Sequence, residues 1–181
     1  VREVTRDGKT VFDYRTASEV YACQRLDNGN TFVGECNTGR LLEVAPDGVT
    51  IVKETRLLAE GSDGGHLFMR NARRLSDGHF LVAHYGGHTV TEYDAEGRKV
   101  WEASAPSGPH SVARLADGHT LFTTGDHAKD PRITEVDKSG AVVWEVRNQD
   151  LPGAPFRFLA GFQRLPNGNT LVCNWLGHGE L

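Results

Sequence analysis

The sequence lacks several features that would assign it to a class of protein at once. No apolar run approaches the roughly 18–20 residues of a membrane-spanning helix, and no signal peptide is visible. Lys and Arg form no cluster and the formal net charge is −4, so neither nucleic acid nor an anionic membrane surface is expected as a partner. The P-loop, the nucleophile elbow and the GxGxxG fingerprint are also missing. Because the chain begins at Val1, we expect a mature product, a trimmed chain or a fragment.

Cysteine is scarce, with one residue each at positions 23, 36 and 173. No CxxC pair is present to suggest zinc. We expect the three to be small buried residues of strands. One disulfide plus a free thiol stays open as the alternative.

One motif occurs four times. It begins with Arg-Leu, continues through Asn-Gly or Asp-Gly and ends in an alternating apolar run, at 25–33, 74–82, 114–122 and 164–172. Asn-Gly and Asp-Gly favour the positive φ angles of a two-residue hairpin turn. Each repeat therefore opens with a predicted hairpin. The four Arg residues repeat identically, which favours a structural role for them, because the residues of a ligand site should differ between repeats.

A second motif alternates with the first. It runs from a Glu through a Gly turn into a second apolar run, at 3–12, 43–52, 92–101 and 135–144. Two hairpins in a period of about 45 residues predict a four-stranded antiparallel blade, the unit of a β-propeller. No segment has a sustained 3.6-residue apolar period, so little helix is expected.

The repeats predict one all-β propeller domain over 1–181, with blade strands a to d numbered from the axis outward. The chain begins with strands c and d of a split blade and ends with strands a and b of that blade. The predicted parts are 1–14, 17–54, 66–103, 110–146 and 157–181. The chain could close as a four-bladed ring, form half of an eight-bladed ring in a homodimer, or belong to a longer array.

These two motifs resemble the PQQ-like and arylsulfotransferase-like β-propeller repeats over essentially the whole chain. In quinoprotein-type repeats a Trp near the end of strand d docks neighbouring blades. Trp101 and Trp144 match that position, Phe12 substitutes for it and Val52 departs from it. The resemblance covers dehydrogenases, sulfotransferases with a catalytic histidine, and binding scaffolds, and it implies a periplasmic or secreted protein. Without a vicinal Cys pair or a calcium-ligand string, PQQ itself is not expected as a cofactor.

Histidine is distributed unevenly between the two predicted faces of the propeller. His79 and His119 follow the turn Gly, where other repeats have Asn, so they indicate turn chemistry. The other six map to the face with the longer b–c and d–a loops, at positions 66, 84, 88, 110, 127 and 178. Longer loops on a rigid scaffold are where function tends to collect.

The repeats diverge at two equivalent positions on that same face. Ten residues after each Arg of the Arg-Leu pair stand Glu35, His84, Thr124 and Asn174. Four residues before it stand Tyr21, Arg70, His110 and Ala160. Divergence at equivalent positions is what an asymmetric ligand site would produce, and unselected surface drift would produce it too.

The primary hypothesis is a binding scaffold for a small polar molecule, a glycan or a protein. Aromatic side chains could stack on a sugar while amide and carboxylate groups bind its hydroxyls, or the aromatics could simply pack. The candidate ligand-binding residues are Glu35, Asn71, Tyr85, Asp126, His127, Asn174 and Trp175.

The alternative hypothesis is an enzyme of the arylsulfotransferase or polysaccharide-lyase type. His110 or His84 would act as base or nucleophile, and Arg70 would neutralise an anionic substrate. Histidines that merely line a wet channel are the simpler reading of the same pattern. A divalent metal is a third option, with His84 and His88 as ligands beside Asp126 or His127.

Overall fold

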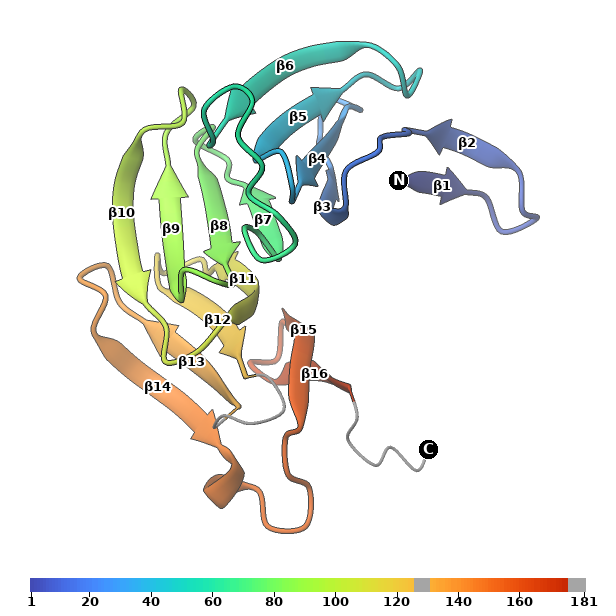
Figure 1. Ribbon diagram of the computed structural model, residues 1–181. Coiled ribbons are helices and arrows are strands. Elements are labelled where there is room, and N and C mark those ends of the chain that lie inside the picture. Colours follow the sequence, from blue (N-terminus) through green and yellow to red (C-terminus); the bar gives the residue numbers. More distant parts are fainter. Residues whose placement is uncertain (126–130, 176–181) are drawn as a thin grey trace.

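The computed structural model describes residues 1–125 and 131–175 (Figure 1). Three four-stranded antiparallel sheets and two two-stranded sheets follow one another along an arc, which confirms the predicted all-β propeller architecture. The described part of the chain contains one short 3₁₀ helix, η1 (Asn148–Asp150), and no helix long and apolar enough to cross a membrane.

Each complete blade is a meander in which consecutive strands pair. The first contains β3 (Val20–Arg25), β4 (Thr31–Glu35), β5 (Arg40–Val44) and β6 (Ile51–Arg56); the second β7 (Asn71–Arg74), β8 (Phe80–His84), β9 (Thr89–Tyr93) and β10 (Lys99–Ser104); the third β11 (Pro109–Arg114), β12 (Thr120–Thr124), β13 (Arg132–Val136) and β14 (Val142–Arg147). The half-blades are β1 (Arg2–Val4) with β2 (Thr10–Asp13), and β15 (Phe158–Arg164) with β16 (Thr170–Trp175). The first strands of successive units, β3, β7, β11 and β15, contact one another along the inside of the arc.

The a–b hairpins use a different turn from the one that Asn-Gly and Asp-Gly predict. In the first repeat the Gly29 N–H donates to the Leu26 carbonyl, and only the glycine has positive φ, at 85°. Asn28 instead accepts a hydrogen bond from the backbone N–H of Asn30 through its side chain. The prediction of a two-residue turn is therefore wrong. The hairpin is a four-residue turn closed by a left-handed glycine, which still lets strands a and b pair.

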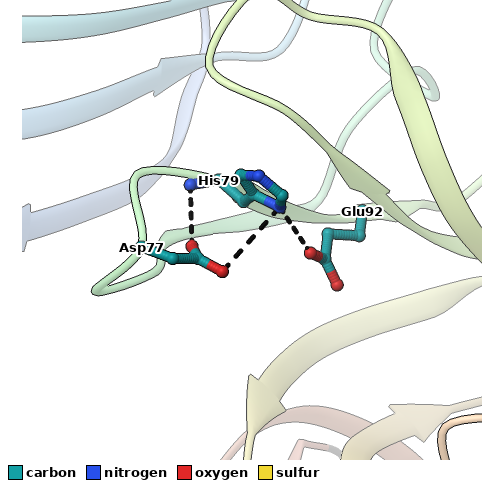
Figure 2. A group of neighbouring side chains, drawn as sticks. All are labelled: Asp77, His79 and Glu92. Carbon is teal, nitrogen blue, oxygen red and sulfur yellow. Dashed lines mark hydrogen bonds and ion pairs between the residues drawn. The ribbon is translucent and has the colours of Figure 1, made fainter.

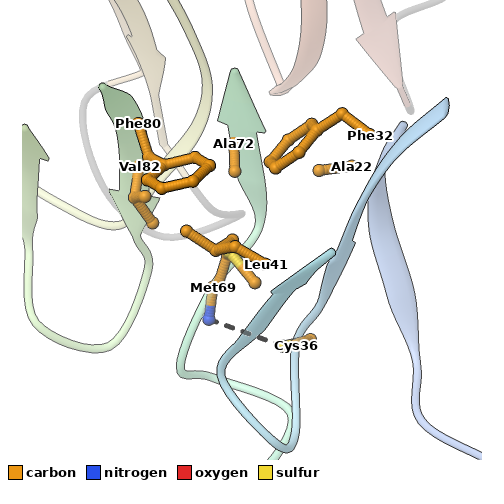
Figure 3. Close-up of a cluster of buried hydrophobic side chains, with 8 residues drawn as sticks. All are labelled: Ala22, Phe32, Cys36, Leu41, Met69, Ala72, Phe80 and Val82. Carbon is orange, nitrogen blue, oxygen red and sulfur yellow. Dashed lines mark hydrogen bonds between the residues drawn. The ribbon is translucent and has the colours of Figure 1, made fainter. Parts of the chain in front are cut away.

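The hydrophobic core lies between blades rather than within one sheet. Four clusters of buried side chains correspond to the four junctions between successive units. Figure 3 shows the cluster between the first two complete blades, where the rings of Phe32 and Phe80 stack 5.8 Å apart. Gly34 lies in this interface, and a Cβ there would approach the Cβ of Ala22 to 3.0 Å. Ala22 is the cross-strand partner of Gly34 in the same sheet, whereas Met69 and Ala72 of the next blade would lie 3.4 and 3.6 Å from that Cβ, in close contact across the interface.

The Arg of the Arg-Leu pair joins the third complete blade to the second. Arg114 donates to the Gly118 carbonyl of its own turn (3.0 Å), pairs with Glu92 of the preceding blade and lies over the Trp101 ring (5.0 Å). These contacts satisfy the guanidinium and cover it with an aromatic face from the neighbouring sheet.

The same arginine contacts occur where each half-blade meets its neighbour. The junction between the first two complete blades is the exception. Arg25 pairs with Glu3 and lies over Phe12, and Arg164 pairs with Glu135 (3.0 Å) and lies over Trp144. At the remaining junction Val52 stands at the aromatic position, and Arg74 stacks on Phe80 of its own blade (4.6 Å). The structural role expected for the arginines, and the blade-docking role that the resemblance implies for the aromatic position, agree with the contacts of Arg25, Arg114 and Arg164.

The two half-blades do not meet in the described structure. Each forms its own two-stranded sheet at one end of the arc, so the clasp of a four-bladed ring is not made. Leu171 of β16 is 59% exposed, whereas Leu81 and Leu121 at the same position of complete blades are fully buried. Val4 of β1 is likewise 53% exposed, against 0% for Val44. These edges are consistent with pairing to more of a longer chain or to a second copy.

The cysteines differ from the sequence expectation. Cys36 is buried in the first interface, but Cys23 and Cys173 are exposed, and all three are free thiols. The alternative of a disulfide is therefore not realised among the described residues. Cys173 occupies a position that complete blades bury as Gly34 and Ala83, so its exposure follows from the missing outer half of its blade.

We expect Arg114→Met to destabilise the protein by about 2–4 kcal/mol, because Glu92 loses its cationic partner in a partly buried junction. Arg98→Met is the matched control: Arg98 is 74% exposed and pairs only with exposed or turn carboxylates, so little or no loss of stability is expected. Urea unfolding monitored by tryptophan fluorescence measures both. Equal effects of the two substitutions would show that the junction does not hold the blades together.

Candidate functional site

The inner strands enclose a cavity of about 940 Å³ at the centre of the arc. Its walls come from all three complete blades and from the C-terminal half-blade, with further residues from the β6–β7 and β8–β9 loops. The lining residues are Tyr21, His66, Arg70, Asn71, Arg73, Tyr85, His110, Ser111, Phe158, Ala160, Gly161, Phe162 and Trp175. A concave, largely aromatic site with a few converging polar groups is the usual form of a small-molecule site.

The residues four positions before each Arg of the Arg-Leu pair all line this cavity. A register shift lets two residues of an inner strand face one residue of its partner, with Tyr21, His110 and Ala160 as the extra residues of β3, β11 and β15. In the second blade Asn71 pairs with Ala83, and the Arg70 N–H also donates to the Ala83 carbonyl (3.0 Å). A β-bulge turns the extra side chain out of the normal alternation, and here it directs that side chain to the axis.

Arg70 is the most constrained cation of the cavity. Its guanidinium carbon lies 4.7 Å from the centre of the Tyr21 ring and 5.1 Å from that of Tyr85, so two tyrosines from different blades flank it. A terminal nitrogen of Arg70 contacts His66 Nε2, and His66 Nδ1 lies 2.6 Å from a carboxylate oxygen of Glu19. Because arginine can only donate, His66 accepts through Nε2 and donates its Nδ1 proton to Glu19. The Glu19–His66 pair therefore fixes the orientation of Arg70.

The cavity wall carries positive charge without an acidic counterpart. No Asp or Glu is among the described residues that line it. Neither Arg70 nor Arg73 forms an ion pair within the described part of the chain, and Arg73 donates only to the Cys23 carbonyl (3.5 Å). The Nε of Arg70 is buried and has no hydrogen-bond partner. An anionic group in the cavity would supply the missing acceptor.

Aromatic rings line the same cavity in a continuous row. The His110 ring lies 4.8 Å from the Tyr85 ring and 4.3 Å from Phe158, and Phe158 meets Trp175 edge-on at 5.0 Å. A Cβ at Gly108 would lie 2.3 Å from the Tyr85 ring, so only glycine leaves room for that ring. Tyr85 therefore contacts Arg70 and His110 together, and it links the charged and aromatic parts of the cavity.

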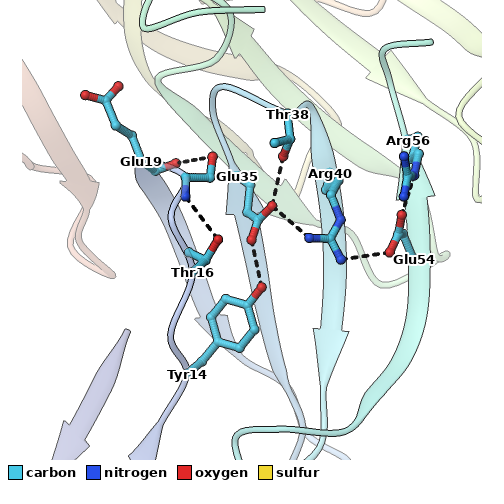
Figure 4. A network of polar contacts seen from close by, with 9 residues as sticks. Tyr14, Thr16, Glu19, Glu35, Thr38, Arg40, Glu54 and Arg56 are labelled. Atoms are coloured by element: carbon cyan, nitrogen blue, oxygen red, sulfur yellow. Dashed lines mark hydrogen bonds and ion pairs between the residues drawn. The ribbon is translucent and has the colours of Figure 1, made fainter. Parts of the chain in front are cut away.

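Glu35 lies outside the cavity, in the polar network of Figure 4. Its carboxylate is fully buried and accepts hydrogen bonds from Tyr14 (2.7 Å), Thr38 (2.8 Å) and Arg40 (3.2 Å). Burial alone would raise the pKa of Glu35, but these donors hold it below its ordinary value. Burial and the bond to Glu35 raise the pKa of Tyr14 to about 12. The network ties the segment after β2 to the first complete blade.

The structure does not bring His84 together with His110 and Arg70. His84 is buried at the end of β8, where Nδ1 donates to the Phe68 carbonyl (2.9 Å) and Nε2 accepts from the Tyr93 hydroxyl (2.8 Å). Burial lowers the pKa of His84, so the neutral ring is favoured. Both ring nitrogens are engaged, which leaves this histidine no lone pair for a metal in this state. His88 is exposed in the β8–β9 loop, and no described group of metal-ligating residues joins it to His84.

The other sequence candidates divide between the cavity and the scaffold. Asn71, Tyr85 and Trp175 line the cavity. The Asn174 side chain instead accepts from the Arg157 N–H (2.8 Å) and donates to a carbonyl of the preceding loop, which holds the entry to β15. Asp126 and His127 lie outside the described residues.

Two groups of Asp, His and Glu occur on the opposite face, at the a–b turns. Figure 2 shows Asp77, His79 and Glu92, whose ligand atoms all lie within 4.8 Å of one another. His79 Nδ1 donates to Glu92 (2.7 Å), and the second oxygen of Glu92 accepts from Arg114. Asp117, His119 and Glu135 repeat this arrangement.

These groups are part of the blade junction. In the first blade Asn30 takes the place of the histidine and donates to Glu43 at 2.6 Å. An amide is a poor substitute for a metal-binding imidazole but an equal hydrogen-bond donor. The His–Glu contacts therefore fix the carboxylate that receives the next blade's arginine, which extends the turn chemistry expected for His79 and His119.

Sequence reasoning left part of the cavity out of the candidate residues. His66 and Arg73 are not among the candidate site residues, because His66 lies in a loop without a counterpart in the other repeats and Arg73 resembles a residue of the repeated motif. Phe158 follows an irregular segment that gives no periodic signal. Tyr21 could have been selected, since it shares the divergent position with Arg70 and His110.

The hydrogen bonds to Glu92 and Glu135 raise the pKa values of His79 and His119 above their ordinary value of 6.5. A raised folded-state pKa stabilises the fold fully below the unfolded pKa, and this stabilisation is lost as pH rises through the folded-state value. We therefore expect the double variant His79→Asn, His119→Asn to lower Tm most below about pH 6.5.

Asn keeps the donor, as Asn30 does, but carries no titrating proton. The Tm difference between wild type and the double variant should shrink as pH rises to 9. A difference that is independent of pH in calorimetry would exclude a protonated histidine from the junction.

No protein-family model matches this sequence, and no curated protein matches it. Among solved structures, a Bacteroides caccae protein of unknown function is 27% identical with a TM-score of 0.80, and the match covers 98% of this chain and 64% of that one. A catalytically inactive His-to-Ala variant of virginiamycin B lyase from Staphylococcus aureus, solved with quinupristin, is 19% identical with a TM-score of 0.64, covering 96% and 56%. Kuenenia stuttgartiensis hydrazine synthase is 18% identical with a TM-score of 0.64, covering 97% and 50%.

The chain thus spans between half and two thirds of the length of these structures. Membership of the PQQ-like or arylsulfotransferase-like families stays a prediction. The similarity shows that the chain has the β-propeller fold.

Proposed function

We propose that this chain is a binding scaffold whose central cavity takes a small organic anion. The observation that carries the proposal is Arg70, which is fixed between Tyr21 and Tyr85 and has no carboxylate partner among the described residues. Keeping a guanidinium partly buried without a counter-charge costs free energy, and a bound anion would recover it. Because His66 and Glu19 already hold the side chain in place, little further ordering would be needed on binding.

The row of aromatic rings supports a ligand that contains a ring. Phe158 and Trp175 line the same cavity as the arginines, and Trp175 is 58% exposed. Exposed aromatic side chains beside a charged group suit a ligand with one flat or apolar face and one anionic end. The cavity volume of about 940 Å³ is in the range of small-molecule sites.

Benzoate is the simplest probe that combines a ring and an anion. We expect isothermal titration calorimetry to detect benzoate but not its neutral analogue benzamide, and Arg70→Leu to weaken benzoate by about 10- to 100-fold through loss of a charge-assisted hydrogen bond. Arg15→Leu is the control, because Arg15 is 81% exposed and lies outside the cavity. Equal affinity of the Arg70→Leu variant and the wild type for benzoate would refute the anion site.

A second candidate function is catalysis on such an anion, with His110 as base or nucleophile. His110 and Arg70 both contact the Tyr85 ring, so substrate held by Arg70 would lie near the imidazole. In the S. aureus virginiamycin B lyase a His-to-Ala variant is catalytically inactive.

We expect His110→Gln to retain benzoate binding and to abolish turnover of uronate-containing glycans or aryl sulfates. His84→Gln is the comparison, since His84 lies outside the cavity. If neither substrate class is turned over by the wild type, the catalytic candidate is dropped and the binding scaffold remains.

A further inference from the structure

Two consecutive residues at the start of β7 both line the central cavity. Successive side chains of a regular strand point to opposite faces, but Arg70 and Asn71 both line the cavity: Asn71 pairs with Ala83, and the Arg70 N–H also donates to the Ala83 carbonyl. The start of β7 therefore presents a guanidinium and an amide side by side. No other pair of consecutive charged and amide residues lines the cavity among the described residues.

The Asn71 amide is as incompletely satisfied as the guanidinium beside it. Its Oδ1 is buried without a hydrogen-bond partner, as is Arg70 Nε. The side chain of Asn71 makes no hydrogen bond within the described residues. An acceptor that is buried and unpaired destabilises the empty cavity.

The Arg70 guanidinium and the Asn71 amide require different functional groups in a ligand. Arg70 needs an acceptor, which a carboxylate supplies. The Oδ1 of Asn71 needs a donor, which a carboxylate lacks at neutral pH but a hydroxyl has; a hydroxyl also accepts, so it suits either end of the amide. The ligand should therefore carry a hydroxyl close to its carboxylate.

We infer that the cavity binds a hydroxy acid built on a ring, of the acidic-sugar class, with the carboxylate on Arg70 and a neighbouring hydroxyl on Asn71. The apolar face of the sugar ring packs on Phe158 and Trp175, as aromatic side chains favour. This inference rests on the proposed anion site and adds to it a hydroxyl requirement and a second anchoring residue.

Calorimetric titrations with three probes test the inference on the 181-residue chain. They are the methyl glycoside of galacturonic acid, methyl galactoside, which lacks the charge, and benzoate, which lacks the hydroxyls. We expect the uronate to bind and the galactoside not to bind. Asn71→Leu should weaken the uronate about 10-fold and leave benzoate unchanged, because only the uronate uses the amide.

Asn71→Asp provides a variant of the same size that keeps a polar group at the strand start. Its carboxylate repels an acid, so it should weaken both the uronate and benzoate, while circular dichroism and Tm report whether the blade is intact. If Asn71→Leu leaves uronate affinity unchanged, or weakens benzoate equally, the hydroxyl requirement is overturned and the anion site stands. If neither acid binds the wild type, the proposed function fails and the inference fails with it.

Discussion

At three of the four junctions an arginine of the inner strand holds neighbouring units together, and the rest of the structure depends on that contact. A propeller blade cannot bury both of its faces alone, so its stability comes from the interfaces with adjacent blades. Arg114, with Glu92 and Trp101 of the preceding blade, closes the turn face of one such interface, while the buried cluster below it supplies the apolar area. The half-blades have the same contacts through Arg25 and Arg164, so the pattern of blade docking continues to both ends of the described arc.

The arginine contacts lie at the a–b turn end of the inner strands, so the residues at the opposite ends of these strands can differ between repeats. There β3, β11 and β15 have a bulge, and the equivalent position of the second blade precedes β7. These four positions line the cavity with an aromatic phenol, a guanidinium, an imidazole and a methyl group. Four equivalent backbone positions thus build an asymmetric cavity from a nearly symmetric scaffold. The charge of Arg70 and the hydrogen-bonding capacity of Asn71 are the features that give this cavity its chemistry.

The fold could be predicted from the sequence because its glycine turns and its docking residues, such as Trp101, recur at a fixed spacing. The turn type could not, since Asn-Gly is compatible with several hairpins, and in the Asn28-Gly29 turn only the glycine takes positive φ. The residue four positions before each repeated arginine lines the cavity, because the backbone of each inner strand directs that position to the axis. Counting ten forward reached Glu35 and His84, whose side chains are buried in the scaffold. His66 could not be assigned, because its contact with Arg70 joins a loop to the start of β7 and has no sequence period.

The central claim is that Arg70 and Asn71 together receive a hydroxy acid in the cavity. The most direct measurement is a crystal structure of the chain soaked with 5-bromosalicylate, which carries a carboxylate beside a hydroxyl on a ring and a bromine that can be located by anomalous scattering. The account predicts a bromine peak inside the cavity, with the carboxylate in hydrogen-bond contact with Arg70 and the hydroxyl with Asn71. A cavity without density for the acid, in a crystal whose bromine peaks lie elsewhere on the surface, would contradict it.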